Sequence, residues 1–122
     1  MVDEITLTLP REPNFHRVAH LVLGGLAVRL DLTMENLEDL QIALESILDR
    51  TEAKAGDVTV RMRLNDGELE TLVGPLTARM LDAIERDPDD SLGIRRVLDS
   101  TVDDVHVDWE WVRLTKKVAA RG

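Results

Sequence analysis

Apolar residues recur along this chain at two spacings, one typical of strands and one typical of helices. Near the start, Ile5, Leu7 and Leu9 alternate with threonines, which predicts a half-buried strand ending at Pro10. The clearest strand covers 58–64, where four apolar residues alternate with Thr and Arg. Both segments therefore belong to a sheet with one buried face.

Turn residues place the other strands. Asn65-Asp66-Gly67 predicts a hairpin, because these residues tolerate positive φ, and the returning strand runs over 68–73 until Gly74-Pro75 breaks it. A strand containing Val105 and Val107 follows later. A last strand, around 111–114, comes after a tight turn near 108–110.

Helical spacing fills the intervals between these strands. It predicts a helix from about Asn14 to Leu30, a second one capped by Thr33, and short helices over 76–85 and near 94–98. Gly24-Gly25 interrupts the first helix at a cost of about 1 kcal/mol per glycine. We expect this pair to allow close packing on a neighbouring element; a phosphate loop is the alternative.

The resulting order is strand, helix, helix, strand, strand, helix, helix, strand, strand. This order favours an α+β fold, a two-layer α/β sandwich with a mixed, mainly antiparallel sheet and helices on one face. At 122 residues, with no repeat and no interior linker, we expect one domain over 1–122.

Composition excludes several classes of protein. A net charge of −9 argues against nucleic-acid binding, and the basic residues Arg113, Lys116, Lys117 and Arg121 are expected on an edge strand and tail. The absence of cysteine excludes disulfides and cysteine-based zinc sites. No apolar stretch could span a membrane, and the acidic N-terminus does not resemble a signal peptide, so we expect no membrane association and a cytoplasmic protein.

Three groups of residues could carry function. His16 and His20 have a metal-compatible spacing, although a surface pair without a ligand role is the simpler interpretation. Trp109 and Trp111 could form a binding hot spot; a turn between them would leave one for packing, most simply Trp111. Glu45 and Asp49 share one face of the second helix, as acid/base carboxylates or as a solvated polar stripe.

The order of strands and helices along the whole chain, together with several segments, resembles the bacterial anti-sigma-factor serine kinases, a branch of the histidine-kinase-like ATPase fold. The segments are Ile5-Thr6-Leu7-Thr8-Leu9-Pro10, the run 39–45 on the second helix, and the closing run 92–105. The resemblance implies that fold for the chain. It also implies a nucleotide site with three parts, each of which can be compared with this sequence.

In that family, a helical Glu polarises the attacking group and an Asn four residues later holds Mg²⁺. Here Glu45 matches the Glu, which makes it the catalytic candidate, and Asp49 replaces the Asn. An aspartate can still ligate Mg²⁺, so Asp49 is a metal candidate only if ATP binds.

The other two parts of the site are damaged. In the Asp-x-Gly-x-Gly turn that holds adenine, Leu72 replaces the Asp and Leu76 a glycine, while Gly74 remains. In the phosphate loop, Gly93 remains and Ser91 replaces a glycine, after the acidic residues Asp87, Asp89 and Asp90. Asp49, Gly74 and Gly93 are therefore candidates for a vestigial cofactor site.

This pattern predicts a regulatory protein-binding module in transcriptional partner switching, with ATP binding lost or weak and no cofactor. The resemblance implies a sigma factor or an anti-sigma antagonist as the partner, and allows a homodimer. The alternative is an active serine kinase that uses ATP and Mg²⁺. A third possibility is a scaffold recruited to an unrelated role.

Overall fold

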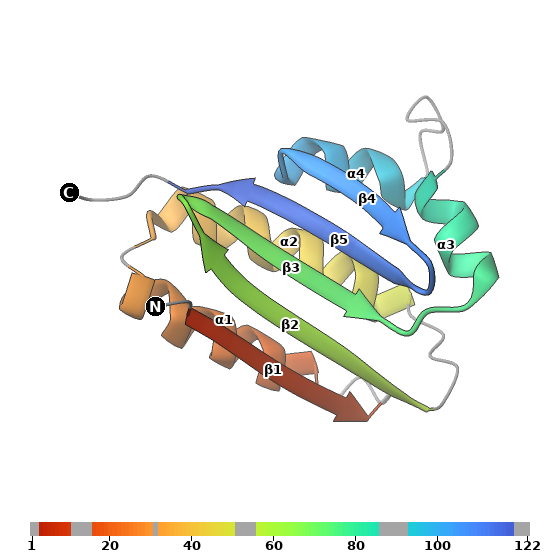
Figure 1. Cartoon of the computed structure of the whole chain (residues 1–122), viewed down its shortest axis with the longest axis horizontal. Coiled ribbons are helices and arrows are strands. Elements are labelled where there is room, and N and C mark those ends of the chain that lie inside the picture. Colours follow the sequence, from red (N-terminus) through yellow and green to blue (C-terminus); the bar gives the residue numbers. More distant parts are fainter. Residues whose placement is uncertain (1–2, 11–15, 31, 51–55, 86–92, 119–122) are drawn as a thin grey trace.

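The computed structural model describes residues 3–10, 16–30, 32–50, 56–85 and 93–118. The strands form one five-stranded sheet, and Figure 1 shows this sheet in front of a layer of helices. In chain order the elements are β1 (Asp3–Pro10), α1 (His16–Leu30), α2 (Met34–Arg50), β2 (Asp57–Asn65), β3 (Glu68–Gly74), α3 (Ala78–Glu85), α4 (Ile94–Thr101), β4 (Asp104–Asp108) and β5 (Trp111–Lys117). The predicted sequence of elements is confirmed.

The strands lie in the order β1-β2-β3-β5-β4, and all four pairings between neighbours are antiparallel. The expected α+β sandwich is confirmed. Its sheet is antiparallel throughout, whereas a mixed, mainly antiparallel sheet was expected. The reason lies in the connections: β2–β3 and β4–β5 are hairpins, and the helix pair between β1 and β2 returns the chain beside its starting strand. The expectation that β5 is an edge strand was wrong, because β5 lies between β3 and β4.

Local signals in the sequence explain where several elements begin and end. Asp66 and Gly67 both have positive φ, 50° and 78°, as a tight hairpin turn between twisted strands requires. The Thr33 hydroxyl accepts a hydrogen bond from the Asn36 amide at 3.1 Å, so the predicted cap of α2 is confirmed. Thr77 caps α3 in the same way, through the Met80 amide.

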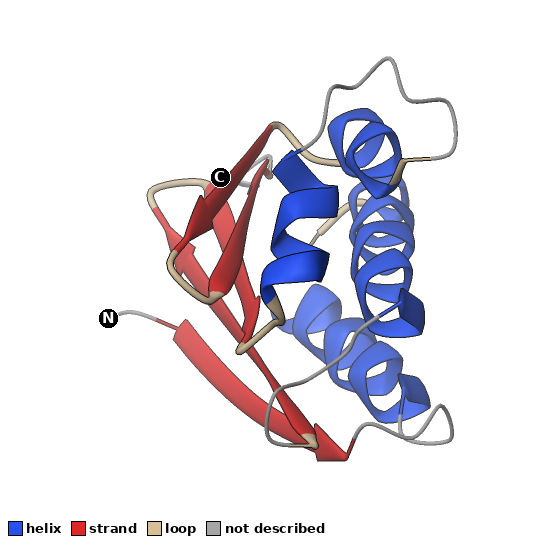
Figure 2. Ribbon diagram, turned by 90° about the vertical axis from the view of Figure 1, so that its right-hand side faces the viewer, coloured by secondary structure: helices blue, strands red, loops and turns tan. Residues whose placement is uncertain are grey.

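The core lies between the sheet and the helices, and Figure 2 shows these two layers edge-on. Side chains alternate between the two faces of the sheet along each strand. One set faces the helices and is buried, for example Val60, Met62, Val73 and Leu114. Residues of the other parity form an open face without covering helices in the described part of the chain. A functional site can therefore be sought in the helical layer or on the open face.

Gly24 and Gly25 do not serve close packing within the chain, so that expectation was wrong. A Cβ atom built on either residue would meet nothing within 4 Å. Gly25 is exposed and Gly24 half-buried, both in the middle of α1.

Within the described residues, no helix combines the length and apolar character needed to cross a bilayer.

Candidate functional site

Glu45 and Asp49 lie on the exposed side of α2, away from the core residues Leu44, Ile47 and Leu48. The Glu45 carboxylate lies 3.8 Å from the ring of His20 on α1, and its side chain is 54% exposed. The two candidates for the first part of the predicted site thus lie together on the surface of one helix. As for the predicted histidine metal site, the described residues contain no group of three or more His, Cys, Asp or Glu that could hold a metal ion.

The end of β3 determines what the second part of the site can offer. Apart from Gly74 at its end, the buried residues of β3 are Leu69, Thr71 and Val73, so their side chains face the helices. Leu72 is half-buried and has the opposite parity, paired in register with Arg61 and Arg113. Its side chain therefore lies on the open face and does not fill a cleft beside the helices. None of the β3 residues that face the helices is an aspartate or a glutamate. This holds even if a residue other than Leu72 is matched to the family's Asp.

Gly74 is required by packing within the chain. A Cβ atom there would lie 2.7 Å from Cδ2 of Trp111 and 3.0 Å from the carbonyl oxygen of Glu110. The following Gly74–Pro75 peptide is cis, and the Leu76 amide then donates to the Glu110 carbonyl at 2.8 Å. The glycine retained from the predicted nucleotide turn thus lies against an indole ring.

Leu76, which stands where the family has a glycine, is fully buried in the core. It contributes a large apolar side chain at the point where the chain leaves β3. Leu76 therefore serves as a core residue in this fold.

Gly93 is the N-cap residue of α4, with extended backbone and no side-chain cap. Its carbonyl accepts a hydrogen bond from the Arg96 amide at 3.2 Å. The rest of the predicted phosphate loop, Ser91 with Asp87, Asp89 and Asp90, lies outside the described residues. The candidate residues therefore come from three elements, α2, β3 and the start of α4.

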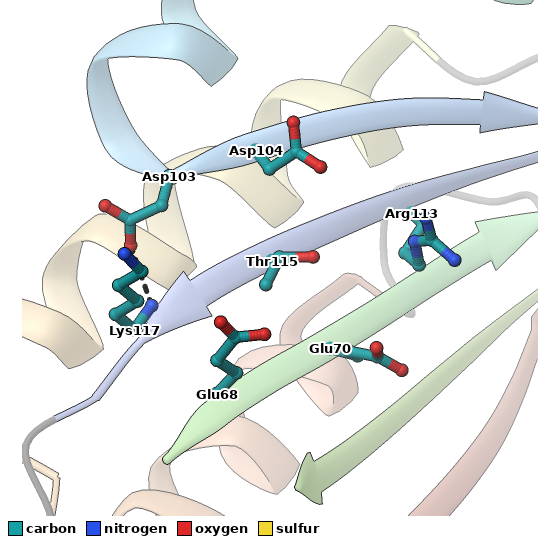
Figure 3. Close-up of a pocket in the computed structure, with 7 residues that line it drawn as sticks. All are labelled: Glu68, Glu70, Asp103, Asp104, Arg113, Thr115 and Lys117. Carbon is teal, nitrogen blue, oxygen red and sulfur yellow. Dashed lines mark hydrogen bonds between the residues drawn. The ribbon is translucent and has the colours of Figure 1, made fainter. Parts of the chain in front are cut away.

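Sequence reasoning missed a polar hollow of about 500 Å³ on the open face, shown in Figure 3. The signal was present, because charged residues alternate with apolar ones along β3 and β5. Some of its carboxylates have partners: Arg63 donates to Glu70 at 2.8 Å, and Asp103 accepts from the backbone amide of Lys117. Glu68 is paired in register with Lys117. The hollow is lined by Glu68, Glu70, Asp103, Asp104, Arg113, Thr115 and Lys117. We interpret it as a solvated polar surface.

Trp109 lies in the β4–β5 turn and Trp111 begins β5, so the turn places the two tryptophans in different surroundings, as the sequence allowed. Trp111 packs against Gly74, which confirms its packing role. Trp109 has a positive φ of 59° and is 86% exposed.

Comparisons with known proteins agree with the fold and with the predicted resemblance. A serine-protein kinase RsbW from Listeria innocua is 33% identical over 79 residues, which are 60% of this chain and 50% of the relative. The serine-protein kinase RsbW of Bacillus subtilis is 30% identical over 77 residues, 58% of this chain and 48% of the relative. The chain thus spans about half the length of the curated relatives it matches. No family model matches the chain.

A solved structure extends the likeness to nearly the whole chain. The RsbU and RsbW domains of Rv1364c from Mycobacterium tuberculosis match 95% of this chain and 32% of that one, with a TM-score of 0.65 at 14% identity. The TM-score shows a shared fold, and at so low an identity the likeness shows the fold alone. The resemblance to the anti-sigma-factor serine kinases is therefore confirmed: this chain is a relative of the serine-protein kinases RsbW in sequence and shares its fold with a structure that contains an RsbW domain.

Proposed function

We propose that this chain is a regulatory protein-binding module of the anti-sigma type, which acts by partner switching without depending on ATP. Its relatives are serine-protein kinases RsbW, which supports a role in the same kind of regulation. A sigma factor or an anti-sigma antagonist is the partner class that we propose. We also propose that it works in the cytoplasm.

The observation that carries the proposal is the set of side chains at the end of β3. The adenine amine needs an accessible hydrogen-bond acceptor there, and β3 offers the helix side no carboxylate. Leu69 and Val73 are apolar, the Thr71 hydroxyl is buried in the core, and the buried Leu76 follows. A ligand group that loses its hydrogen bond on burial costs about 1–3 kcal/mol. Gly74 lies against Trp111, so its retention has an explanation that involves no nucleotide.

A second candidate function is a serine kinase with an altered Mg²⁺ ligand. It is favoured by the printed names of the relatives and by Glu45 and Asp49, which share the exposed side of α2. In this version Glu45 would polarise the attacking hydroxyl, Asp49 would hold Mg²⁺ and Gly93 would lie near the phosphates. An exposed carboxylate with access to solvent can ligate such a cation.

Thermal unfolding with ATP and Mg²⁺ distinguishes the two functions. A ligand at a hundred times its Kd adds about 2.7 kcal/mol to the free energy of unfolding. We expect millimolar ATP with Mg²⁺ to leave the Tm unchanged. A clear rise in Tm that is lost in Glu45→Ala and in Asp49→Ala would instead establish the kinase.

The binding role needs its own measurement. The chain is titrated by calorimetry with the sigma factors and antagonist-type domains of its own organism. We expect one of them to bind without added nucleotide. Binding that requires ATP would support the kinase, and a complete lack of binding would contradict the regulatory role.

A further inference from the structure

The β4–β5 hairpin carries an exposed tryptophan at its tip. Trp109 is 86% exposed, the highest fraction among the large apolar residues that lie on the surface of the described chain. The other exposed ones all lie on α1 and α2, so Trp109 has a separate location. Single exposed apolar residues are ordinary on protein surfaces, but an indole ring has far more apolar area than most of them. Leaving this ring in water is therefore unfavourable for the isolated chain.

The backbone at Trp109 is also unfavourable for its side chain. Asp108 and Trp111 are paired in register, which leaves a two-residue turn of Trp109 and Glu110. Trp109 has a φ of 59°, whereas the φ of Glu110 is not positive. These are the φ signs of a type II′ turn, which favours glycine at its first central position. A bulky residue with such a φ is strained.

The β2–β3 hairpin shows no such conflict between residue type and turn. Its turn residues, Asp66 and Gly67, have φ values of 50° and 78° and are the types that a turn with two positive φ values favours. Figure 1 shows the two hairpin turns at opposite ends of the sheet. Strained residues cluster at functional sites, where another requirement outweighs their cost to the fold. Trp109 therefore marks the β4–β5 turn as a candidate for binding.

The base of this turn is held against the end of β3. The Leu76 amide donates a hydrogen bond to the Glu110 carbonyl at 2.8 Å. The Trp111 ring lies so close to Gly74 that a Cβ atom on the glycine would be 2.7 Å from it. A side chain on such a support loses little conformational freedom when it binds, which favours affinity. Because β4 is an edge strand, one side of the hairpin is also open to a partner.

The charges beside Trp109 indicate the kind of partner. Asp108 and Glu110 flank it in sequence, Asp108 is exposed, and the whole chain has a net charge of −9. Nucleic acids and anionic membranes would meet like charge here, and so would the same hairpin of a second copy. A protein surface with Lys or Arg would instead be attracted to the Asp108 carboxylate.

We propose that the tip of the β4–β5 hairpin is a docking site for a protein partner, in which Trp109 inserts into an apolar pocket with basic residues at its rim. The indole ring supplies the buried apolar contact, and Asp108 steers the two proteins together. This inference goes beyond the proposed function, because it names the contact surface and holds for a partner of any class.

Photo-crosslinking in the chain's own organism identifies the partner. Benzoylphenylalanine is incorporated in place of Asp108, which keeps the indole beside it, and in a control chain in place of Asp66 at the opposite turn. We expect a protein that is crosslinked from position 108 and not from position 66. A chain that crosslinks no protein specifically from position 108, or only a second copy of itself, would overturn the proposal.

Calorimetric titration of the purified partner then measures the contribution of each side chain. Trp109→Ala should weaken binding at least about 30-fold, because an inserted indole is a hot spot. Asp108→Asn should weaken binding several-fold, mainly by slowing association at low salt. Leu21→Ala, which removes an exposed apolar side chain on α1, is the matched control and should leave the affinity unchanged. An unchanged affinity in Trp109→Ala would overturn the proposal, even where the partner is a sigma factor or an antagonist and the proposed function stands.

Trp109→Gly gives a second test, in which two measurements must move in opposite directions. Glycine adopts a positive φ without strain, so the Tm should rise by about 2–5 °C while binding weakens as in Trp109→Ala. Asp66→Gly, at a turn residue that already tolerates positive φ, should change the Tm by less than about 1 °C and leave binding unchanged. A lower Tm in Trp109→Gly would show that the indole serves the fold, and the proposal would fail.

Discussion

Thr71 is a polar residue within the apolar core, on the helix-facing side of β3. The residue is 3% exposed, and its hydroxyl has no hydrogen-bond partner among the residues that the structure describes. Burying a hydroxyl without a partner is unfavourable, because the group loses its hydrogen bonds to water. Thr101, the other buried threonine, donates to the carbonyls of Val97 and Leu98.

We therefore expect Thr71→Val to raise the free energy of unfolding by about 1 kcal/mol, since the shape is kept and the unsatisfied group is removed. Thr101→Val, the matched control, should lower the free energy by about 1 kcal/mol because it loses a bonded hydroxyl. Urea unfolding at constant m-value measures both. A destabilised Thr71→Val would mean that its hydroxyl finds a partner in solution.

Gly74 gives a second prediction at the scale of single residues. Gly74→Ala should destabilise the protein by about 1–3 kcal/mol, because the new Cβ would overlap Trp111 and the Glu110 carbonyl. Thermal unfolding of Gly74→Ala, Trp111→Ala and the double variant measures the coupling. The double variant should be less destabilised than the sum of the single ones. Strictly additive losses would show that the ring and the glycine do not compete for this space.

Among the elements, Lys116 joins β5 to two helices. Its ammonium group lies 3.0 Å from the Asp39 carboxylate on α2 and 3.0 Å from the carbonyl of Thr101 at the end of α4. The side chain is largely buried. A cation at the C-terminal end of a helix is also favoured by the helix dipole.

Lys116→Met should therefore lower the free energy of unfolding by about 1–2 kcal/mol, since Asp39 and the end of α4 lose a common partner. Lys117→Met, which removes an exposed lysine next in sequence, should change it by less than about 0.5 kcal/mol. Chemical denaturation of the two variants makes the comparison. Equal effects would mean that Lys116 acts only through the net charge.

At the scale of the whole molecule, the dominant electrostatic feature is the net charge of −9. Like charges held close together on a folded chain repel each other, and salt screens that repulsion. The ion pairs Arg61–Glu4 and Arg95–Asp99 are partly exposed, and surface pairs of this kind contribute little.

Adding NaCl up to about 0.5 M should consequently raise the Tm, because screened repulsion outweighs weakened surface pairs. Calorimetry in a salt series provides the measurement, with Na₂SO₄ at equal ionic strength to separate screening from specific ion effects. A Tm that falls with NaCl would mean that attractive pairs dominate the balance.

Most of the fold could be predicted from the sequence, because its determinants are local. The alternation over 58–64, the Asn65-Asp66-Gly67 turn and the Thr33 cap each encode their structure within a few residues. The insertion of β5 between β3 and β4 could not be predicted, because it depends on pairing between strands distant in sequence.

The candidate site was less predictable for the same physical reason. Matching Gly74-Pro75 to the family turn assigned a role to Leu72, but only the strand register shows that this side chain lies on the open face. Likewise, Gly74 and Gly25 look equivalent in sequence. Three-dimensional neighbours distinguish a glycine under an indole ring from a glycine with open space beside it.

The position of β5 also has a consequence for the time at which the protein can fold. β5 follows every other strand in sequence, yet it supplies a hydrogen-bonding partner to both β3 and β4. During synthesis, β1, β2 and β3 can pair as soon as they leave the ribosome, whereas β4 has no neighbour until residues 111–117 have emerged. Until then the unpaired edge of β3 and the apolar side chains of β4 remain open to association with other chains or to chaperones. The sheet can therefore be completed only after its last strand, β5, has been synthesised.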